Sequence, residues 1–104
     1  MLDEKYEILN KNLSMSGLVF LVGINKKIPE LLHHNVIFSD DYKKEFEEIF
    51  DYNKFPSDPT VYINCPTKTD PSLAPNNSES IFLMCNSPST KENWNEDLLS
   101  LIHV

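Results

Sequence analysis

The segment from Ser16 to Ile24 constrains the fold more than any other part of the sequence. It reads Ser-Gly-Leu-Val-Phe-Leu-Val-Gly-Ile, so both alternating sets of its side chains are apolar. A strand covered on two faces shows this pattern, whereas a half-exposed strand alternates apolar with polar residues. We therefore expect 16–24 to be the central and most buried strand of a sheet.

Three further segments have the pattern of strands. They are residues 33–38, 60–65 and 80–86. In 60–65 the side chains of Val61, Ile63 and Cys65 share one face and those of Thr60, Tyr62 and Asn64 share the other. Because successive side chains of a strand point to opposite faces, we expect the first set to face the core and the second to be partly wet. The run 80–86 places Ile81, Leu83 and Cys85 together in the same way.

Helical patterns lie around these strands. The clearest follows Ser39-Asp40-Asp41, which offers an N-cap, and its apolar positions are Tyr42, Phe46, Ile49 and Phe50. We expect its other face, which carries Lys43, Lys44, Glu47 and Glu48, to be solvated. Residues 3–12, a short segment from Pro29 to Leu32, and the residues after the capping box 89–92 are also predicted as helices. The fold class expected is α+β, with a mixed sheet of about four strands and three to four helices.

Size and charge exclude several classes of protein. The chain has 104 residues and a net charge of -7, and all nine of its basic residues are Lys. This length fits one domain, and the acidic balance argues against a nucleic-acid partner. The longest apolar run, 18–24, is far shorter than the roughly 20 residues that cross a bilayer. We therefore expect no transmembrane segment. Because the first residues lack the pattern of a secretory signal, we also expect a cytoplasmic protein with reduced cysteines.

No complete catalytic or metal motif is present. His33 and His34 are adjacent, so on an extended segment they would point to opposite faces and could not easily share a metal. Cys65 and Cys85 lack the spacing of a zinc site and look like small core residues. With glycine only at 17 and 23, a phosphate-cradling loop is not expected.

The aspartates have structural roles that explain them. Asp40 and Asp41 stand at the start of a predicted helix, where negative charge is favourable. Asp58 and Asp70 each precede a proline in a turn, where a carboxylate bonds to the following backbone. A lining role in a site remains the alternative for Asp58 and Asp70.

Several blocks of the sequence resemble the phytoene desaturase (phytoene dehydrogenase) family of carotenoid-forming flavoenzymes, over roughly residues 5–98. The blocks are Ser16 to Gly23, Leu32-His33-His34-Asn35-Val36-Ile37-Phe38-Ser39-Asp40-Asp41-Tyr42, Asp58-Pro59-Thr60-Val61-Tyr62 and Thr69-Asp70-Pro71-Ser72-Leu73-Ala74-Pro75. There are departures. Lys68 stands where the family commonly has Arg, and Asn76-Asn77 stand near its usual Gly, although Asn tolerates a positive φ.

The resemblance implies a partial substrate-binding domain over residues 1–104, taken from a two-domain FAD/NAD(P)-binding flavoenzyme whose Rossmann-like FAD-binding domain this sequence does not include. The implied activity is FAD-dependent dehydrogenation of a long apolar isoprenoid or carotenoid, with this segment forming part of the substrate-channel wall. We expect no FAD, other cofactor or metal to be held by this segment alone. The implied partners are the substrate and the remainder of the parent enzyme, which could contact a membrane peripherally.

Among the matched positions, His33, His34, Asp58 and Asp70 are the candidates to lie nearest to substrate or flavin. Specific catalytic residues are not identified. The alternative function is a free-standing module that uses the same sheet to bind an apolar ligand or a partner protein without catalysis. The sequence leaves open which polyene is the substrate and whether the parent enzyme is a desaturase, an oxygenase or an isomerase.

Overall fold

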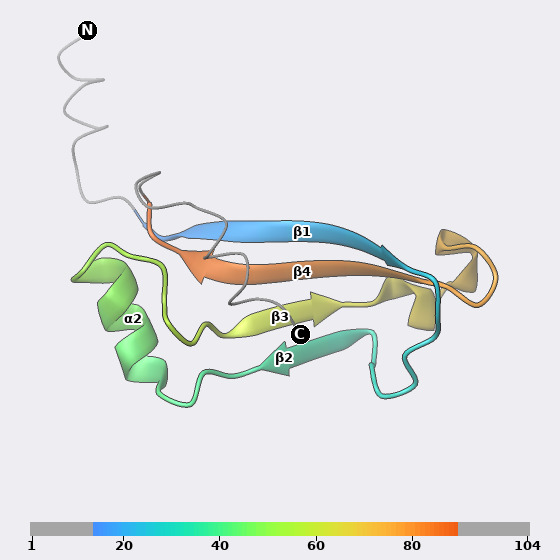
Figure 1. Cartoon of the computed structure of the whole chain (residues 1–104), viewed down its shortest axis with the longest axis horizontal. Coiled ribbons are helices and arrows are strands. Elements are labelled where there is room, and N and C mark those ends of the chain that lie inside the picture. Colours follow the sequence, from blue (N-terminus) through green and yellow to red (C-terminus); the bar gives the residue numbers. More distant parts are fainter. Residues whose placement is uncertain (1–13, 90–104) are drawn as a thin grey trace, which may run out of the picture.

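The computed structural model describes residues 14–89. Its elements in chain order are β1 (Ser16–Ile24), β2 (His34–Ile37), α2 (Tyr42–Phe50), β3 (Val61–Asn64), the 3-10 turns η1 (Pro66–Lys68) and η2 (Pro71–Leu73), and β4 (Glu79–Ser87). The four strands form one sheet in the order β1-β4-β3-β2. Figure 1 shows α2 at one end of this sheet and the two 3-10 turns at the other. The helix predicted at 3–12 lies outside the described residues. So does the helix predicted after the capping box 89–92; of that box only Ser89 is described, and it is in no helix.

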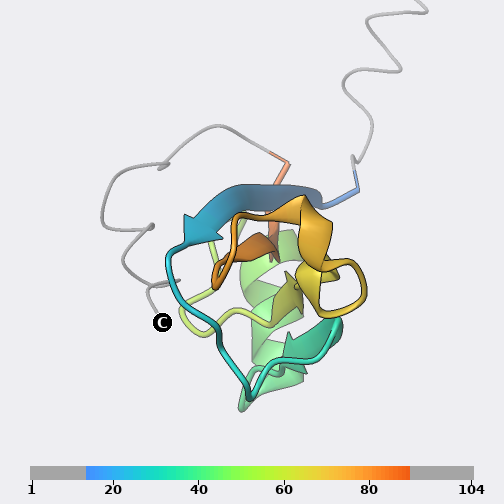
Figure 2. The same ribbon diagram turned by 90° about the vertical axis from the view of Figure 1, so that its right-hand side faces the viewer.

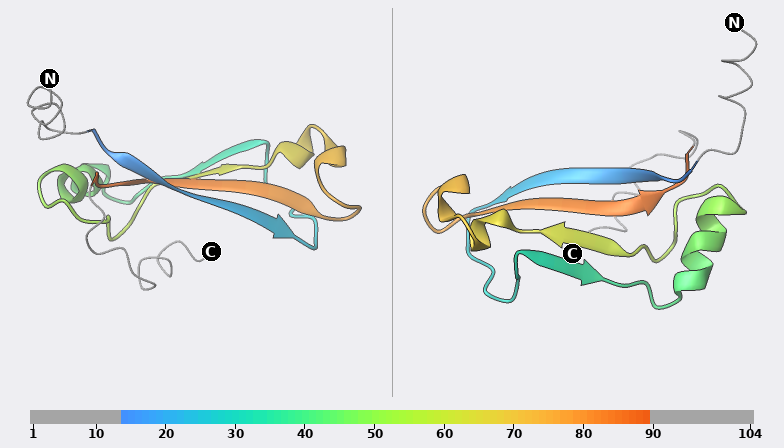
Figure 3. Two further views of the ribbon diagram at one scale, coloured as in Figure 1. Left: turned by 90° about the horizontal axis from the view of Figure 1, so that it is seen from above. Right: turned by 180° about the vertical axis from the view of Figure 1, so that it is seen from behind.

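The prediction of a mixed sheet was wrong for the described residues, because all three strand pairs are antiparallel. A strand, a helix and a second strand in sequence suggest a parallel crossover. Here α2 does not cross a face of the sheet. Seen edge-on in Figure 3, it lies beyond the end of the strands, so β3 returns beside β2 in the opposite direction.

The prediction that 16–24 is a central, fully buried strand was also wrong. The strand itself is confirmed as β1, but among the described strands it lies at one edge and pairs with β4 alone. Its burial alternates. Leu18, Phe20 and Val22 pack against the core, whereas Leu21 on the opposite face is 81% exposed. Both faces of β1 are therefore apolar, but within residues 14–89 only the face that carries Leu18, Phe20 and Val22 is covered.

The sheet is strongly twisted (Figure 2), and the core lies on one of its faces. Its buried members are Phe55, Val61, Ile63, Cys65, Ile81 and Cys85. The register places Val61 opposite Cys85 and Ile63 opposite Leu83, so the alternation predicted for 60–65 and 80–86 is confirmed. The other predicted strand, 33–38, is present as the shorter β2.

The helix α2 begins and ends close to the predicted positions, but it turns a different face to the fold. Asp41 caps it by accepting a hydrogen bond from the Lys44 backbone N–H at 3.0 Å. The buried residues of α2 are Glu45, Glu48 and Ile49. Glu48 was expected on the solvated face, and that expectation was wrong because its carboxylate binds the turn at Ser57.

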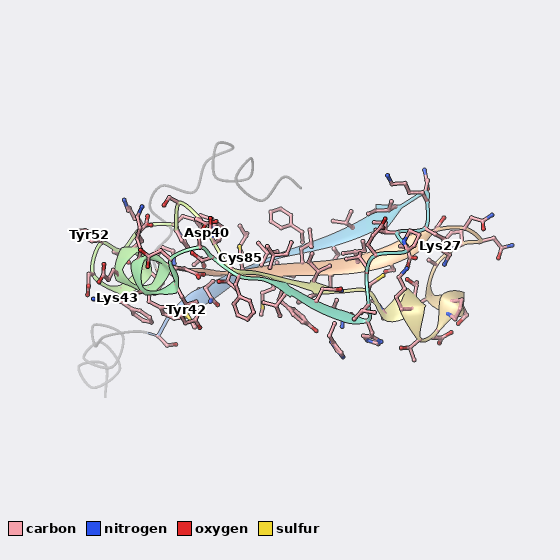
Figure 4. The ribbon with its side chains drawn as sticks, turned by 90° about the horizontal axis from the view of Figure 1, so that it is seen from below. Lys27, Asp40, Tyr42, Lys43, Tyr52 and Cys85 are labelled. Atoms are coloured by element: carbon pink, nitrogen blue, oxygen red, sulfur yellow. The ribbon has the colours of Figure 1, made fainter. Side chains whose placement is uncertain are left out.

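The apolar stripe of α2 lies largely outside the core. Tyr42 and Phe50 are both 54% exposed, and the ring of Phe46 contacts both of theirs. Figure 4 shows Tyr42 with Lys43 and Tyr52 at this end of the molecule, while Lys27 lies at the opposite end. On the face predicted to be solvated, Lys43 Nζ pairs with Glu47 Oε1 at 3.7 Å.

The predicted helix from Pro29 to Leu32 is absent, and a turn takes its place. Its backbone makes one hydrogen bond, from Leu31 N–H to Ile28 O. The Asn35 side chain then binds both the N–H and the carbonyl of Leu32, at 2.9 and 2.7 Å, and so competes with helical backbone bonding. In the loop before β4, Asn77 has a φ of 59°, which agrees with the expectation that asparagine serves where a glycine would fit.

Candidate functional site

The sheet face opposite the core is open, and it is largely apolar. We call it the open face; its side chains are those of Val19, Leu21, His34, Val36, Tyr62, Asn64, Phe82 and Met84. The register arranges them in two rows that cross all four strands. One row is Val36, Tyr62, Met84 and Val19, and the other is His34, Asn64, Phe82 and Leu21. With strands about 4.8 Å apart, each row extends for about 14 Å.

The apolar side chains of the open face are unusually exposed to solvent. Val19, Leu21, Val36 and Met84 are exposed by 45, 81, 48 and 36%, respectively. Gly23 continues the face at one end of β1, and a Cβ atom built on it would meet nothing within 4 Å. A contiguous exposed apolar surface of this kind is typical of a site for an apolar ligand or another protein surface.

One corner of the open face is polar. We call the side chains of His34, Tyr62 and Asn64 the polar corner. Tyr62 Oη lies 2.7 Å from His34 Nδ1, and Asn64 Nδ2 donates to Tyr62 Oη at 3.2 Å. Asn64 Nδ2 also lies 3.4 Å from His34 Nδ1. Aromatic rings connect this corner to the apolar part of the open face. The centroid of the Tyr62 ring lies 6.2 Å from that of His34 and 6.3 Å from that of Phe82.

The prediction that the two histidines point apart was wrong. Their ring centroids lie 4.4 Å apart, because His33 precedes β2 and is outside the regular strand. His33 Nδ1 contacts Thr69 Oγ1 at 2.6 Å, and its carbonyl accepts the Cys65 N–H at 2.8 Å. Both Nδ1 atoms therefore have protein partners. Among residues 14–89 no three His, Cys, Asp or Glu side chains gather closely enough to hold a metal ion.

Asp58 lies at the other end of the sheet, at the N-terminus of α2. Its Oδ2 accepts hydrogen bonds from the Asp40 N–H at 2.7 Å and from the Ser39 hydroxyl at 3.2 Å. It borders a polar hollow of about 230 Å³, whose lining residues are Ser39, Asp40, Asp41, Lys44, Glu45, Glu48, Ser57 and Asp58. The prediction that Asp58 bonds to the backbone that follows it was therefore wrong, because its carboxylate holds the residues before α2, and this structural role explains Asp58 without a ligand.

The buried carboxylates of this hollow are likewise committed to the chain. Glu45 accepts from the Thr60 N–H at 2.9 Å and from its hydroxyl at 2.6 Å, and Glu48 accepts from the Ser57 N–H and hydroxyl. The hydrogen bonds from Ser57, together with Lys54 at 3.5 Å, lower the pKa of Glu48 despite the opposing effect of burial. The hollow is a structural joint between α2 and residues 57–60.

Asp70 is a capping residue of η2. Its Oδ1 accepts from the Ser72 N–H at 3.1 Å and hydroxyl at 2.6 Å, and these bonds lower its pKa.

Of the four candidate residues, the structure therefore brings only His33 and His34 together. Tyr62, Asn64 and Phe82 were not among the candidates, although the alternation in 60–65 had already placed Tyr62 and Asn64 on the wetter face.

A second cluster, buried beside the core, centres on Glu79. Its carboxylate accepts hydrogen bonds from the Thr67 hydroxyl and from Cys65 Sγ, and it pairs with Lys68 Nζ at 2.9 Å. The Thr67, Cys65 and Lys68 hydrogen bonds lower the pKa of Glu79 to about 2. Lys68 also donates to the Ile28 carbonyl at 2.7 Å, so it joins three segments of the chain. This cluster could not be predicted from the sequence pattern, because Glu79 lies just outside the predicted strand 80–86.

The two thiols are unsuited to nucleophilic chemistry. Burial raises the pKa of Cys85 to about 11, with a further contribution from the charge of Glu45. Burial also raises the pKa of Cys65, which lies beside the Glu79 carboxylate. Since the thiolate is the nucleophile, both cysteines act as small core residues, as the sequence indicated.

The described residues do not fit a flavin dinucleotide. A pyrophosphate needs free backbone N–H groups at a helix N-terminus and usually a glycine-rich turn. The N-terminus of α2 is capped by Asp41, and the carboxylates of Asp40 and Asp58 lie beside it. Gly17 and Gly23 both lie within β1. Residues 14–89 therefore lack the features of a nucleotide site, whereas their open face suits an apolar ligand. Within the same range no helix has the length and apolar character needed to cross a bilayer.

The chain is similar in sequence to curated carotenoid enzymes. It is 44% identical over 73 residues to the zeta-carotene-forming phytoene desaturase of Myxococcus xanthus, which covers 70% of this chain and 14% of that protein. It is 45% identical over 87 residues to the 1-hydroxycarotenoid 3,4-desaturase of Flavobacterium sp. (strain P99-3), covering 83% and 18%. It is 39% identical over 75 residues to the 4,4'-diapolycopene oxygenase of a Methylomonas species, covering 72% and 15%. The chain spans less than a fifth of the length of these relatives. No protein-family model matches it.

Proposed function

We propose, from the premise that this chain belongs to the phytoene desaturase family of carotenoid enzymes, that it forms part of the substrate-binding domain of an FAD-dependent oxidoreductase. The parent enzyme would remove hydrogens from a carotenoid or a related isoprenoid, with the flavin held by a part of the protein outside this chain. This chain would supply one wall of the substrate channel. The names of the relatives, which are desaturases and an oxygenase of carotenoids, support this substrate class.

The observation that carries the proposal is the open face. A long polyene offers only apolar surface along most of its length, and a site for it needs apolar side chains with few competing polar groups. Six of the eight side chains of the open face are apolar or aromatic, and Leu21, at the β1 edge of this face, is 81% exposed. Burying such side chains stabilises a complex by roughly 25 cal/mol per Å² of apolar area removed from water.

Binding of a hydrocarbon to the 104-residue chain tests the wall directly. We expect an acyclic C20 isoprenoid hydrocarbon, phytane, delivered from cyclodextrin, to shift the NMR signals of the open face. Leu21→Asn should weaken this binding several-fold. Leu32→Asn is the matched control, since Leu32 is 70% exposed but precedes β2 and is not on the open face. Absence of binding, or equal weakening by both substitutions, would contradict the proposal.

A flavin titration separates this function from the alternative of a self-contained module. The purified chain should carry no flavin and should not bind FAD, because residues 14–89 do not fit its pyrophosphate. Hydrocarbon binding without flavin binding agrees with a substrate-side segment. Stoichiometric flavin in the purified chain would show that the division of labour proposed here is wrong.

A further inference from the structure

We propose that the polar corner is a binding site for a hydroxyl group carried by an otherwise apolar isoprenoid that lies on the open face. The proposal rests on the function proposed above, because it assumes that an isoprenoid occupies this face. It adds a specificity element, which is a paired hydrogen-bond donor and acceptor at one end of an apolar surface. A pure hydrocarbon would leave both groups unused.

The contacts at the polar corner determine which nitrogen of His34 carries the proton. Asn64 Nδ2 can only donate hydrogen bonds, and it lies 3.4 Å from His34 Nδ1 and 3.2 Å from Tyr62 Oη. An unprotonated Nδ1 satisfies this contact and also accepts the Tyr62 hydroxyl proton across 2.7 Å. Neutral His34 then carries its proton on Nε2. The three side chains form a directed chain of hydrogen bonds from Asn64 through Tyr62 to His34.

The polar corner leaves one hydrogen-bond donor and one acceptor available to a ligand. Within residues 14–89 neither His34 Nε2 nor Asn64 Oδ1 takes part in a hydrogen bond. The first is a donor and the second is an acceptor, and the two residues are directly opposite each other on β2 and β3. A hydroxyl group both donates and accepts, so it can use both groups, whereas a carbonyl or an ether oxygen can use the donor alone.

The apolar body of the ligand can lie along one row of the open face. The row that begins with His34 and Asn64 continues through Phe82 on β4 to Leu21 on β1. A ligand with its oxygen at the polar corner can therefore lay its hydrocarbon chain across the sheet for about 14 Å. A hydrocarbon would leave the donor of His34 and the acceptor of Asn64 without a partner in the complex, whereas a hydroxyl can satisfy both, which is the physical basis of the expected preference.

A matched pair of ligands tests the inference on the 104-residue chain. The C20 alcohol phytol and the hydrocarbon phytane share the same branched skeleton, and phytol differs by its hydroxyl and by one double bond, for which the hydroxyl-free alkene 2-phytene is the control. A net hydrogen bond of about 0.5–1.5 kcal/mol corresponds to a preference of about 2- to 12-fold for the alcohol. Tyr62→Phe removes the hydroxyl that orients His34 and keeps the ring, so it should abolish the preference while phytane binding persists. Tyr42→Phe makes the same change on exposed α2 and should leave the preference intact.

The outcomes separate this inference from the proposed function. If phytane and phytol bind equally well and Tyr62→Phe has no effect, the hydroxyl site is wrong while the apolar wall stands. If neither ligand binds, the proposed function fails and this inference fails with it. The imidazole ¹⁵N signals of His34 give an independent readout. They should report a proton on Nε2 and shift on addition of phytol but not of phytane, and a proton on Nδ1 would overturn the geometry.

Discussion

Lys68 Nζ lies 2.9 Å from Glu79 Oε1, and the Glu79 side chain is completely enclosed. Lys27 Nζ approaches the same oxygen at 3.9 Å, but its side chain is 43% exposed. A buried carboxylate that loses its close partner remains charged in a medium of low dielectric constant, whereas a distant, solvated partner contributes little. The two lysines therefore offer a matched test of what holds the end of the sheet near η1.

Lys68→Met should lower the denaturation midpoint of the chain clearly, and Lys27→Met should change it little. The first substitution removes both the ion pair with Glu79 and the hydrogen bond to the Ile28 carbonyl. Urea unfolding followed by circular dichroism measures both variants. Equal losses of stability would mean that the solvated pair matters as much as the buried one.

The acid sensitivity of the chain should depend on Glu79. Its pKa is held at about 2 in the fold, below the ordinary value of 4.5, so the folded state binds its proton more weakly than the unfolded state does. The stabilisation is therefore fully present above about pH 4.5 and is lost as the pH falls towards 2. Glu79→Gln should be less stable at pH 7 and should lose less stability between pH 4.5 and pH 2. Parallel stability curves for the two proteins would contradict this assignment.

How far the sequence predicted this fold depends on which contacts a segment makes. Strands β3 and β4 were found because their alternation records the core directly, and α2 was found from its cap at Asp41 and its apolar spacing. The face that α2 buries was not found, because Glu45 and Glu48 bind residues 57–60, and periodicity carries no information about partners distant in the sequence. The edge position of β1 was missed for the same reason.

The candidate site was predictable only in part. Alternation placed Tyr62 and Asn64 on one face, but their meeting with His34 depends on the register of β2 against β3. The sequence motifs singled out Asp58 and Asp70, but the carboxylate of Asp70 binds its own turn and that of Asp58 binds the backbone of Asp40. An aspartate that binds the backbone can have the same local sequence as an aspartate in a ligand site. Only the three-dimensional structure distinguishes the two.

Thr60 should contribute strongly to the joint between α2 and β3. Its N–H and hydroxyl both donate to the buried carboxylate of Glu45. Thr60→Val keeps the shape but leaves one carboxylate oxygen without its donor, at a cost of about 1–3 kcal/mol in the free energy of unfolding. Thr69→Val is the control, because the Thr69 hydroxyl contacts His33 at the exposed surface and water can replace it. A Thr60→Val variant as stable as the control would contradict this role.

Both cysteines should resist thiol reagents in the folded chain. Cys65 and Cys85 are 0% and 3% exposed, and burial raises the pKa of each thiol. Reaction with Ellman's reagent at pH 8 should therefore be slow in buffer and fast in urea, with the rate following the unfolded fraction. Reaction of either thiol at the rate of a free cysteine would show that the core opens without global unfolding.

Gly23 should show a conflict between stability and binding. It lies within β1 opposite Ser80, and a Cβ atom there would meet nothing within 4 Å, so alanine adds no clash in the chain itself. Glycine in a strand costs roughly 0.5–1 kcal/mol relative to alanine, so Gly23→Ala should raise the free energy of unfolding by that amount. If an isoprenoid lies against this end of the open face, the added methyl group should weaken phytane binding. Gly17→Ala is the control, since a Cβ atom there would make ordinary contacts of 3.7 Å with Met84 Cγ and Sδ. We expect Gly17→Ala to have less effect on phytane binding than Gly23→Ala. If Gly23→Ala is more stable and still binds phytane as well as the parent chain does, the ligand lies elsewhere on the sheet.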